Sequence, residues 1–259
     1  MARASAILRA DPVSPAMPMF CWYELRTTDP VAARAFYVDA VGLVVAAADA
    51  CWRLRSDGPE LGEFATLPAQ AAARGAPAHW LGHVAVADVP AAVQRFVALG
   101  ASPLGPVQTR PAGHLVAPLR DPLGCVLAVT SRPEATATLA WCDLHSRDSA
   151  QAAALYGSMF GWASRQSHDL GPLGTYREFA WHPDGPAVGG MSDAARRPEI
   201  HAHWLFHFAV ADLDAALERV RSGGGRAAGE PMRTPDGARV AACEDPQGAA
   251  FALHEPAPR

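Results

Sequence analysis

The side chains in this sequence that are best suited to chemistry are histidines and carboxylates in short hydrophobic runs. Glu24 lies in WYELRTT, Asp143 and His145 lie in WCDLH, and His83 and His207 lie in GHVAVAD and FHFAVAD. Side chains alternate along a strand, so residues two apart share a face of the sheet. Imidazole and carboxylate groups ligate divalent transition metals, and they also bind oxygenated small molecules through hydrogen bonds.

Other catalytic chemistries lack their sequence signatures. All 22 residues counted as Lys or Arg are arginines, which excludes a Schiff-base lysine or a P-loop lysine. The chain has no G-x-S-x-G, H-E-x-x-H or G-x-G-x-x-G motif, so a nucleophile elbow, a zincin helix and a dinucleotide-binding turn are not expected. The five cysteines form no C-x-x-C pair, which argues against a zinc finger and is typical of a reducing cytosol.

Length and composition set the scale of the fold. The chain has 259 residues, half of them hydrophobic, and a formal net charge of -4, which suits two domains of about 120 to 130 residues each. No stretch concentrates basic residues and no long apolar run occurs, so neither a nucleic acid nor a membrane is expected as a partner. Residues 1–18 are rich in proline and lack a secretory signal. We predict a loosely held lead-in there and a cytoplasmic protein.

Internal self-similarity is the most informative feature of the chain. The segment that begins WYELRTTDP aligns with WCDLHSRDS at an offset of 119, and HWLGHVAVADV aligns with HWLFHFAVADL at an offset of 124. The second copy therefore has five extra residues, which we place between Leu170 and Gly190. The chain is predicted to hold two similar domains, 19–131 and 139–259, joined by a linker at 132–138.

Each copy divides again into two units with the same order of elements. Four times a strand-like run ends in an aspartate that can cap a helix, at Asp29, Asp88, Asp148 and Asp212. Short runs of strand length follow each predicted helix. The predicted fold class is therefore α+β, with four β-α-β-β-β modules paired into two tandem domains.

This order of elements resembles the vicinal oxygen chelate superfamily, which includes glyoxalase I, bleomycin-resistance proteins and extradiol dioxygenases. The resemblance rests on the strand-Asp-helix pattern that ends in Phe36-Tyr37 and Gly42-Leu43, on GHVAVAD, and on the D-P-x-G turns at Asp121 and Asp245. It implies two tandem glyoxalase-like domains, each with a cup-shaped sheet. Such a cup often holds a divalent metal, here Fe, Mn, Ni or Zn, that binds two adjacent oxygens of a small substrate.

The metal-ligand positions implied by the resemblance are only partly kept. The histidine of the second module in each domain is matched by His83 and His207. The other two positions hold residues that are not ligands: Trp22 and Ala128 in the first domain, and Trp141 and Ala252 in the second. The standard chemistry of glyoxalases and extradiol dioxygenases therefore does not follow from this sequence.

A shifted ligand set is available in the second domain. Asp143 and His254 each lie two residues beyond a lost ligand position, so both would face the same cup as His207. Two histidines and one carboxylate could make an iron- or manganese-type site with open positions for substrate. His145 and His203 are further candidates in this cup.

The first domain offers fewer candidate ligands. Glu24 and His83 correspond to Asp143 and His207, but Thr130 stands where the second domain has His254. We therefore expect the second cup to be the one that holds any metal. The residues predicted to contact the substrate are Trp22, Glu24, His83, Trp141 and His145.

Structural explanations compete with these roles. Both tryptophans fit the wall of a cup or the core as well as a pocket for an aromatic or hydrophobic ligand. An internal ion pair with Glu24 explains Arg26 better than a clamp for a substrate anion. A hydrogen bond to the backbone at a sheet edge would explain His79 and His203.

The sequence predicts recognition of a small, partly hydrophobic oxygenated molecule in one or both cups. As an enzyme, the protein would polarise two vicinal oxygens on a divalent metal for lyase, isomerase or oxygenase turnover. As a metal-free binding module of the bleomycin-resistance type, it would sequester a toxic compound or an antibiotic. A scaffold with degenerate cups is the third hypothesis. We expect a small-molecule ligand as the partner and a monomer or homodimer as the assembly.

Overall fold

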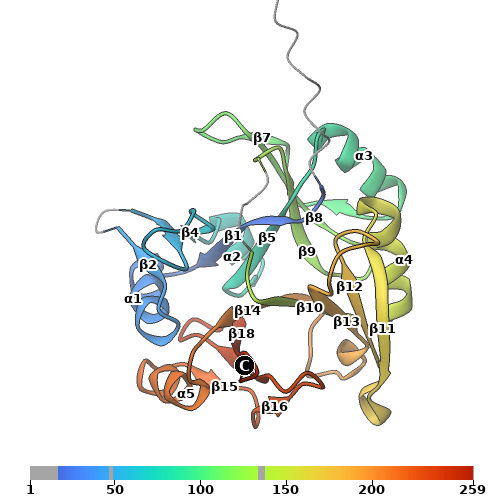
Figure 1. Ribbon diagram of the computed structural model, residues 1–259. Helices are drawn as coiled ribbons and strands as arrows, with labels where there is room; N and C mark the ends of the chain where they lie inside the picture. Colours follow the sequence, from blue (N-terminus) through green and yellow to red (C-terminus); the bar gives the residue numbers. More distant parts are fainter. Residues whose placement is uncertain (1–16, 47–48, 134–137, 259) are drawn as a thin grey trace, which may run out of the picture.

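The computed structural model describes residues 17–46, 49–133 and 138–258 and forms two sheets (Figure 1). Residues 1–16 of the predicted lead-in (1–18) and residues 134–137 of the predicted linker (132–138) lie outside the described residues. In the described ranges, no helix has the length and hydropathy needed to cross a bilayer.

The first domain contains one sheet and three helices. Its elements are β1 (Phe20–Thr27), α1 (Pro30–Ala40), β2 (Val44–Val45), β3 (Cys51–Arg53), β4 (Gly62–Thr66), α2 (Ala69–Ala73), β5 (His79–Ala85), α3 (Val89–Ala98), β6 (Ser102–Pro103), β7 (Gln108–Thr109), β8 (Leu115–Arg120) and β9 (Val126–Thr130). The strands lie in the order β2-β3-β4-β1-β5-β9-β8-β6, and β7 pairs with β8. Strands β1 and β5, which open the two modules, are antiparallel neighbours at the centre.

The second domain repeats this arrangement. Its elements are β10 (Trp141–His145), α4 (Ser149–Phe160), β11 (Ala163–Asp169), η1 (Gly171–Leu173), β12 (Thr175–Ala180), β13 (Gly189–Ser192), η2 (Ala194–Arg196), β14 (His203–Ala209), α5 (Leu213–Ser222), β15 (Arg226–Ala227), β16 (Met232–Arg233), β17 (Arg239–Glu244) and β18 (Ala250–Glu255). The strand order β11-β12-β13-β10-β14-β18-β17-β15 matches the first sheet position by position. The predicted α+β fold of four paired modules is confirmed.

The four long helices begin at the aspartates that the sequence indicates. Asp29, Asp88, Asp148 and Asp212 directly precede α1, α3, α4 and α5, and each carboxylate accepts a hydrogen bond from a backbone N–H of the first turn. These bonds satisfy donors that a helix leaves unpaired at its start. The caps also fix where the central strands β1, β5, β10 and β14 end, and these strands carry most of the candidate site residues.

The extra residues of the second domain are distributed differently from the prediction. Gly62 and Gly189 pair at the same place beside the first strand of their domains, at an offset of 127 rather than 119. The second domain therefore has eight more residues before β13, where it forms the longer hairpin β11-β12. It then has three fewer residues before β14, where the first domain has helix α2, and the net difference is the five residues seen in the sequence.

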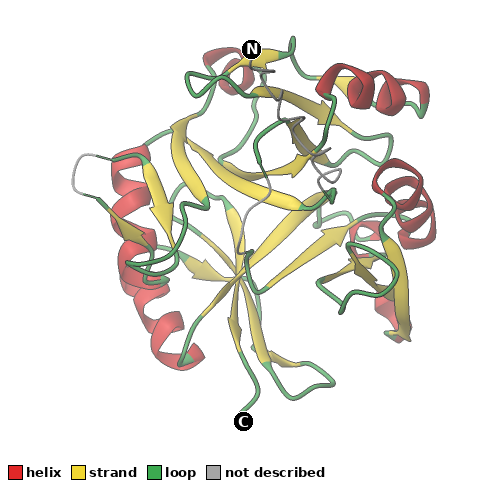
Figure 2. Ribbon diagram, turned by 45° about the horizontal axis from the view of Figure 1, so that its top comes forward, coloured by secondary structure: helices red, strands yellow, loops and turns green. Residues whose placement is uncertain are grey.

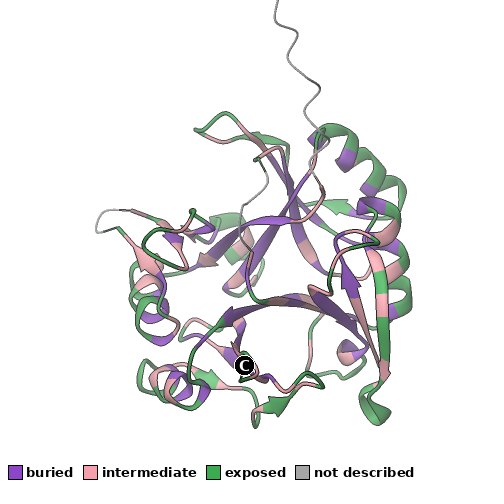
Figure 3. Ribbon diagram, viewed as in Figure 1, coloured by how far each residue is buried: buried purple, intermediate pink, exposed green. Residues whose placement is uncertain are grey.

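The two sheets pack against each other through an aromatic core. The Phe20 ring centroid lies 5.2 Å from that of Phe206 and 5.0 Å from that of Trp204. Gly82 of β5 lies between these rings, and a Cβ atom there would overlap both Phe20 and Phe206. Helix α1 lies beside α5 and α3 lies beside α4, so the helices flank the paired sheets (Figures 1 and 2). The central strands are buried (Figure 3).

Each D-P-x-G aspartate bonds a tyrosine on the first helix of the other domain. Tyr37 Oη donates to Asp245 Oδ2 at 3.3 Å and accepts from Trp80 Nε1 at 2.9 Å. The matching set consists of Tyr156, which donates to Asp121, and Trp204, which donates to Tyr156. The two tyrosines therefore connect the domains.

Candidate functional site

The faces of the two sheets that point away from the aromatic core carry the predicted site residues. We call the face with Trp22, His83 and Ala128 the first cup, because these residues lie side by side on β1, β5 and β9. The second cup has the same row on β10, β14 and β18, made of Trp141, His207 and Ala252. Each row therefore combines one histidine with one tryptophan and one alanine, at the positions where the resemblance implied three ligands.

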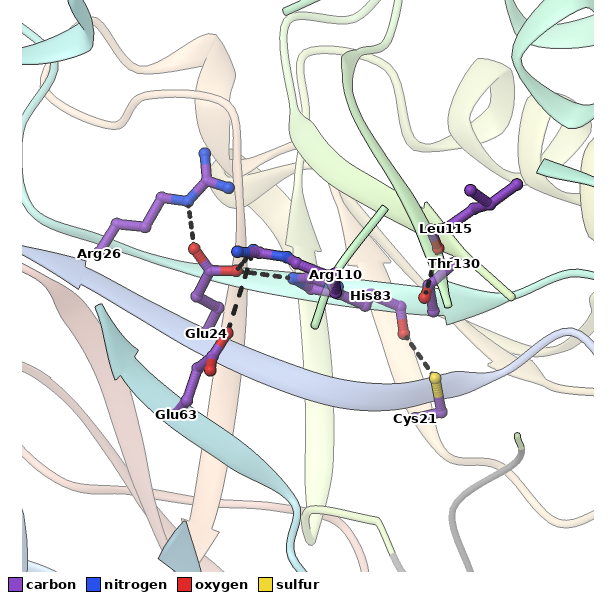
Figure 4. Close-up of polar contacts among 8 residues, drawn as sticks. All are labelled: Cys21, Glu24, Arg26, Glu63, His83, Arg110, Leu115 and Thr130. Carbon is purple, nitrogen blue, oxygen red and sulfur yellow. Dashed lines mark hydrogen bonds and ion pairs between the residues drawn. The ribbon is translucent and has the colours of Figure 1, made fainter. Parts of the chain in front are cut away.

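A buried carboxylate occupies the centre of the first cup (Figure 4). Arg26 Nε donates to Glu24 Oε1 at 2.7 Å, which confirms the predicted internal ion pair. Arg110 Nη2 donates to Glu24 Oε2 at 2.7 Å, and His83 Nε2 lies 3.3 Å from the same oxygen. Burial disfavours the ionised form of Glu24, but the interactions with His83 and Arg26 outweigh it and hold the pKa well below its ordinary value.

The first cup is occupied by its own ion pairs. Arg110 follows strand β7 and reaches across the cup to both Glu24 and Glu63. The Arg132 guanidinium lies 3.7 Å from the ring centroid of Trp22, a cation–π contact. Trp22, Glu24 and His83 are therefore brought together as predicted. Arginines already contact Glu24 and the Trp22 ring, and the role of the three residues toward a substrate stays a prediction.

The second cup surrounds its carboxylate with a histidine, a tyrosine and a tryptophan. His207 Nε2 lies 3.0 Å from Asp143 Oδ2, and Tyr176 Oη donates to Asp143 Oδ1 at 2.7 Å. Trp141 Nε1 lies 3.1 Å from the same Oδ1 and 2.8 Å from Tyr176 Oη. Burial disfavours the Asp143 carboxylate, but the charge and hydrogen bond of His207 outweigh it and lower the pKa of Asp143.

Tyr176 is the residue of this centre that was not predicted from the sequence. It lies on β12, in the region where the two domains differ in length, so the internal repeat gives no signal for it. Gly190 of β13 leaves room for its ring, because a Cβ atom at Gly190 would overlap the Tyr176 ring and hydroxyl. The first domain has Glu63 at the position of Gly190. The adjacent glycines at 189 and 190 were the available sequence signal for a side chain packed over the strand.

The second cup is more open than the first. The Asp143 side chain is 14% exposed, compared with 4% for Glu24. Both arginines that neutralise Glu24 are replaced in the second domain. His145 stands in place of Arg26, and Thr234 stands in place of Arg110. Thr234 donates to Ala238 O in its own turn instead of reaching into the cup.

The structure brings part of the predicted metal set together. Asp143 and His207 are in contact, and the His254 ring centroid lies 6.0 Å from that of His207. The Nδ1 atoms of His207 and His254 are buried without a hydrogen-bond partner among the described residues. In the first domain the equivalent Thr130 donates to Leu115 O at 2.9 Å.

The described residues do not close a three-ligand site in the second cup. In these ranges, the three groups whose ligand atoms all lie within 4.8 Å of one another are Asp49, Cys51 and Glu60, at the edge of the first sheet. The second cup thus offers the ligand types of a transition metal but holds two of them, Asp143 and His207, as a hydrogen-bonded pair. The trio of Asp143, His207 and His254 stays a prediction.

Two further histidines lie in the second cup. His203 Nδ1 lies 2.7 Å from His201 O, which is the backbone hydrogen bond expected at the sheet edge, and His79 makes the same bond to Pro77 O. His145 Nδ1 lies 2.8 Å from Ser192 Oγ. Burial, with a contribution from the nearby His203, lowers the pKa of His145 to about 4.

Stability should depend on pH through His145. Its pKa is about 4 in the folded chain against an ordinary value of 6.5, so between these values the unfolded chain binds more protons. We expect the free energy of unfolding to keep its full value above pH 6.5, where His145 is neutral in both states. It should fall as the pH drops toward 4, with a slope of up to about 1.4 kcal/mol per pH unit from this group. Urea denaturation at several pH values should show a shallower slope in His145→Gln. An unchanged slope, or an equal change in the exposed His201→Gln control, would contradict this.

A cavity of about 290 Å³ opens beside the end of β18. It is lined by residues of the β16-β17 hairpin and the C-terminal segment, including Arg233, Gly237, Arg239 and Glu255. The predicted site residues do not line it, so the candidate site is defined by the polar centre of the second cup.

Both domains match known families. The glyoxalase/bleomycin resistance protein/dioxygenase superfamily matches residues 138–253, and a glyoxalase-like domain matches residues 22–130. Among curated proteins, "Putative glyoxylase CFP32" of Mycobacterium bovis is 28% identical over 252 residues, covering 92% of this chain and 95% of the relative. The anthracycline biosynthesis protein DnrV of Streptomyces peucetius is 34% identical over 127 residues, 44% of this chain and 45% of DnrV.

Solved structures share the fold at low sequence identity. Homoprotocatechuate 2,3-dioxygenase from B. fuscum superimposes with a TM-score of 0.65 at 16% identity, over 94% of this chain and 72% of that chain. The Mn(II)-bound glyoxalase from Novosphingobium aromaticivorans gives a TM-score of 0.61 at 15% identity, over 93% of this chain and 83% of that chain. These likenesses show the fold, and the second of these neighbours is a Mn(II)-bound protein.

Proposed function

The chain belongs to the glyoxalase/bleomycin resistance protein/dioxygenase superfamily, and from that premise we propose that its second cup binds a small, partly hydrophobic oxygenated molecule. The observation that carries the proposal is the partly buried centre of Asp143, His207, Tyr176 and Trp141, whose carboxylate is more exposed than that of Glu24. The equivalent carboxylate of the first cup is neutralised by Arg26 and Arg110. Binding is therefore assigned to the second cup.

The charge states at this centre favour a ligand with a hydroxyl beside a second oxygen. The lowered pKa of Asp143 keeps its carboxylate ionised at neutral pH, so it would accept a hydrogen bond from a ligand hydroxyl. Burial and the neighbouring Asp143 raise the pKa of Tyr176, which stays protonated. Its single O–H donates to Asp143 in the free protein, and it would turn to the second oxygen once the ligand hydroxyl takes its place at Asp143. The Trp141 ring and Leu205, which lies opposite Asp143 on β14, provide apolar surface for the rest of the molecule.

Metal-free binding is the form of this function that the geometry supports better. Two of the three positions in the row of His207 hold Trp141 and Ala252, which are not ligands. Both oxygens of Asp143 already have partners. The ligand would then be sequestered through hydrogen bonds and apolar contact, as the bleomycin-resistance hypothesis expects.

Divalent-metal-assisted chemistry is the second candidate. Its support is that Asp143 and His207 present ligand atoms 3.0 Å apart, and that His207 and His254 have buried, unpartnered Nδ1 atoms. An Fe, Mn, Ni or Zn ion held by these three residues would polarise two vicinal oxygens for lyase, isomerase or oxygenase turnover. Elemental analysis of protein purified without chelator separates the candidates: metal that is lost in His207→Ala favours this one, and a metal content that His207→Ala leaves unchanged favours metal-free binding at this centre.

Ligand affinity should depend on Tyr176 and on the glycine that makes room for it. We expect thermal-shift titrations with small catechols and 2-hydroxyketones, in the presence of chelator, to identify a ligand that stabilises the protein. Tyr176→Phe removes one donor and should weaken binding about tenfold, the effect of about 1.4 kcal/mol. Gly190→Ala should weaken it similarly, because the added methyl group displaces the Tyr176 ring.

Matched controls test whether the loss is specific. Tyr23→Phe makes the same chemical change on the core face of β1, and Gly229→Ala adds a methyl group where no atom lies within 4 Å. Both should bind like the wild type. Combining Gly190→Ala with Tyr176→Phe should cost little more than either alone. Full additivity of the two changes would show that Gly190 does not act through Tyr176.

A further inference from the structure

The geometry points to a second feature of the second cup: we propose that His145 and His203 form a binding site for a divalent transition-metal ion. The two residues lie directly opposite each other on the antiparallel strands β10 and β14. Their ring centroids are 5.0 Å apart and the rings are inclined at 65°. This pair lies four register positions away from the Trp141–His207 pair, so it is separate from the row of positions implied by the family resemblance.

The separation of the rings fits a shared ion. With metal–nitrogen bonds of about 2.1 Å and a roughly tetrahedral angle, two imidazoles on one ion have centroids about 5 Å apart. Zinc, nickel and copper accept imidazole ligands readily. Two protein ligands would leave the remaining coordination positions to water or to oxygens of a bound molecule.

Each ring is held by a hydrogen-bond contact at Nδ1, the nitrogen that would not bind the ion. The carbonyl of His201 can only accept, so His203 Nδ1 carries the proton and its Nε2 presents a lone pair. Ser192 Oγ is in hydrogen-bond contact with His145 Nδ1. Neither Nε2 has a hydrogen-bond partner among the described residues, and neither is among the fully buried unpartnered atoms. Such bonds from the non-ligating nitrogen are the usual way in which a protein orients a metal-binding histidine.

The first domain supplies an internal contrast. His79 stands at the position of His203 and makes the same bond to the backbone. Arg26 stands opposite it, and this side chain is paired with Glu24. A backbone hydrogen bond at the sheet edge therefore explains His79 and His203, one in each domain. The second domain differs because His145, and not an arginine, lies opposite that histidine.

Zinc titration of the full-length protein tests the site. Isothermal titration calorimetry at pH 7.5 should show one Zn²⁺ bound, with a matching rise in the melting temperature. His145→Gln and His203→Gln should each weaken binding at least about tenfold, and the double variant should bind no zinc at this site. Ser192→Ala should weaken binding by about tenfold, the typical effect of removing a group that orients a ligand.

Controls separate this site from the other ligand groups. Cys51→Ala disrupts the Asp49–Cys51–Glu60 cluster, and His207→Gln disrupts the contact with Asp143; both should keep zinc affinity within about twofold. His203→Cys retains a zinc ligand and should bind zinc more tightly than His203→Gln. This comparison shows that the loss of zinc in His203→Gln is not caused by unfolding. The proposal is overturned if the wild type binds no zinc, if the double variant binds like the wild type, or if His207→Gln alone abolishes binding.

Discussion

Glu24→Gln should lower the free energy of unfolding by about 3 kcal/mol, the lower end of the range for breaking a buried ion pair. The glutamine has nearly the same shape, but it leaves Arg26 without its counter-charge and Arg110 with only Glu63, 4.0 Å away. Part of this cost is relieved because the Arg110 side chain is 29% exposed and can move toward water. Urea denaturation at pH 7.5 measures the effect.

Glu63→Gln is the matched control for this prediction. Glu63 is 4.0 Å from Arg110 and its side chain is 30% exposed, so its removal should cost less than about 1 kcal/mol. Because the Glu24 pKa is held low, its contribution is present at neutral pH and is lost as the pH falls through the folded-state pKa. The difference between wild type and Glu24→Gln should therefore shrink in strong acid. Equal stability of the two proteins at pH 7.5 would show that the cluster does not support the cup.

The fold could be predicted from the sequence because its determinants are local and repeated. Each capping aspartate is followed by a helix with an apolar face, and the same order occurs four times along the chain. The alternation of side chains then places Asp143 and His207 on one face, and the structure brings these two into contact. The row of Trp141, His207 and Ala252 lies at the positions that the family resemblance implied.

The surroundings of the two carboxylates could not be predicted in this way. Arg110 reaches Glu24 across 86 positions of sequence, from a turn that has threonine at the same place in the other domain. Tyr176 comes from a hairpin whose length differs between the copies. Long side chains from outside the central strands decide whether an arginine or a tyrosine contacts each carboxylate, and neither periodicity nor repeat alignment reports on such contacts.

Comparison of the two cups shows how one scaffold can hold different chemistry. Both cups keep a carboxylate beside a histidine, Glu24 with His83 and Asp143 with His207. In the first cup, arginines turn this pair into a structural ion cluster. In the second cup, Tyr176 contacts Asp143 in place of an arginine, and the Asp143 side chain stays 14% exposed. The difference explains why we assign ligand binding to the second cup, although both cups have the same row of tryptophan, histidine and alanine.

The domain interface is the site of the second large effect: Tyr37→Phe should lower the free energy of unfolding by about 2 kcal/mol. Loss of the hydroxyl leaves two buried atoms without their partner, Asp245 Oδ2 and Trp80 Nε1. Tyr156→Phe makes the corresponding change at Asp121. Urea denaturation followed by tryptophan fluorescence and by circular dichroism measures both variants and the double variant.

The effect of Tyr37→Phe should also depend on pH, because the hydroxyl supports the ionised form of Asp245. Burial raises the pKa of this carboxyl, and the Tyr37 hydrogen bond works in the opposite direction. Removing the hydroxyl raises the folded-state pKa further, so the penalty falls on the ionised form and should be larger at pH 7.5 than at pH 4.

Because both tyrosines bond the opposite domain, each variant should lower the midpoint of a single unfolding transition of the whole chain. A transition that splits into two steps in the double variant would show that these bonds hold the domains together. A double variant as stable as the wild type would show that the interface depends on its aromatic packing alone.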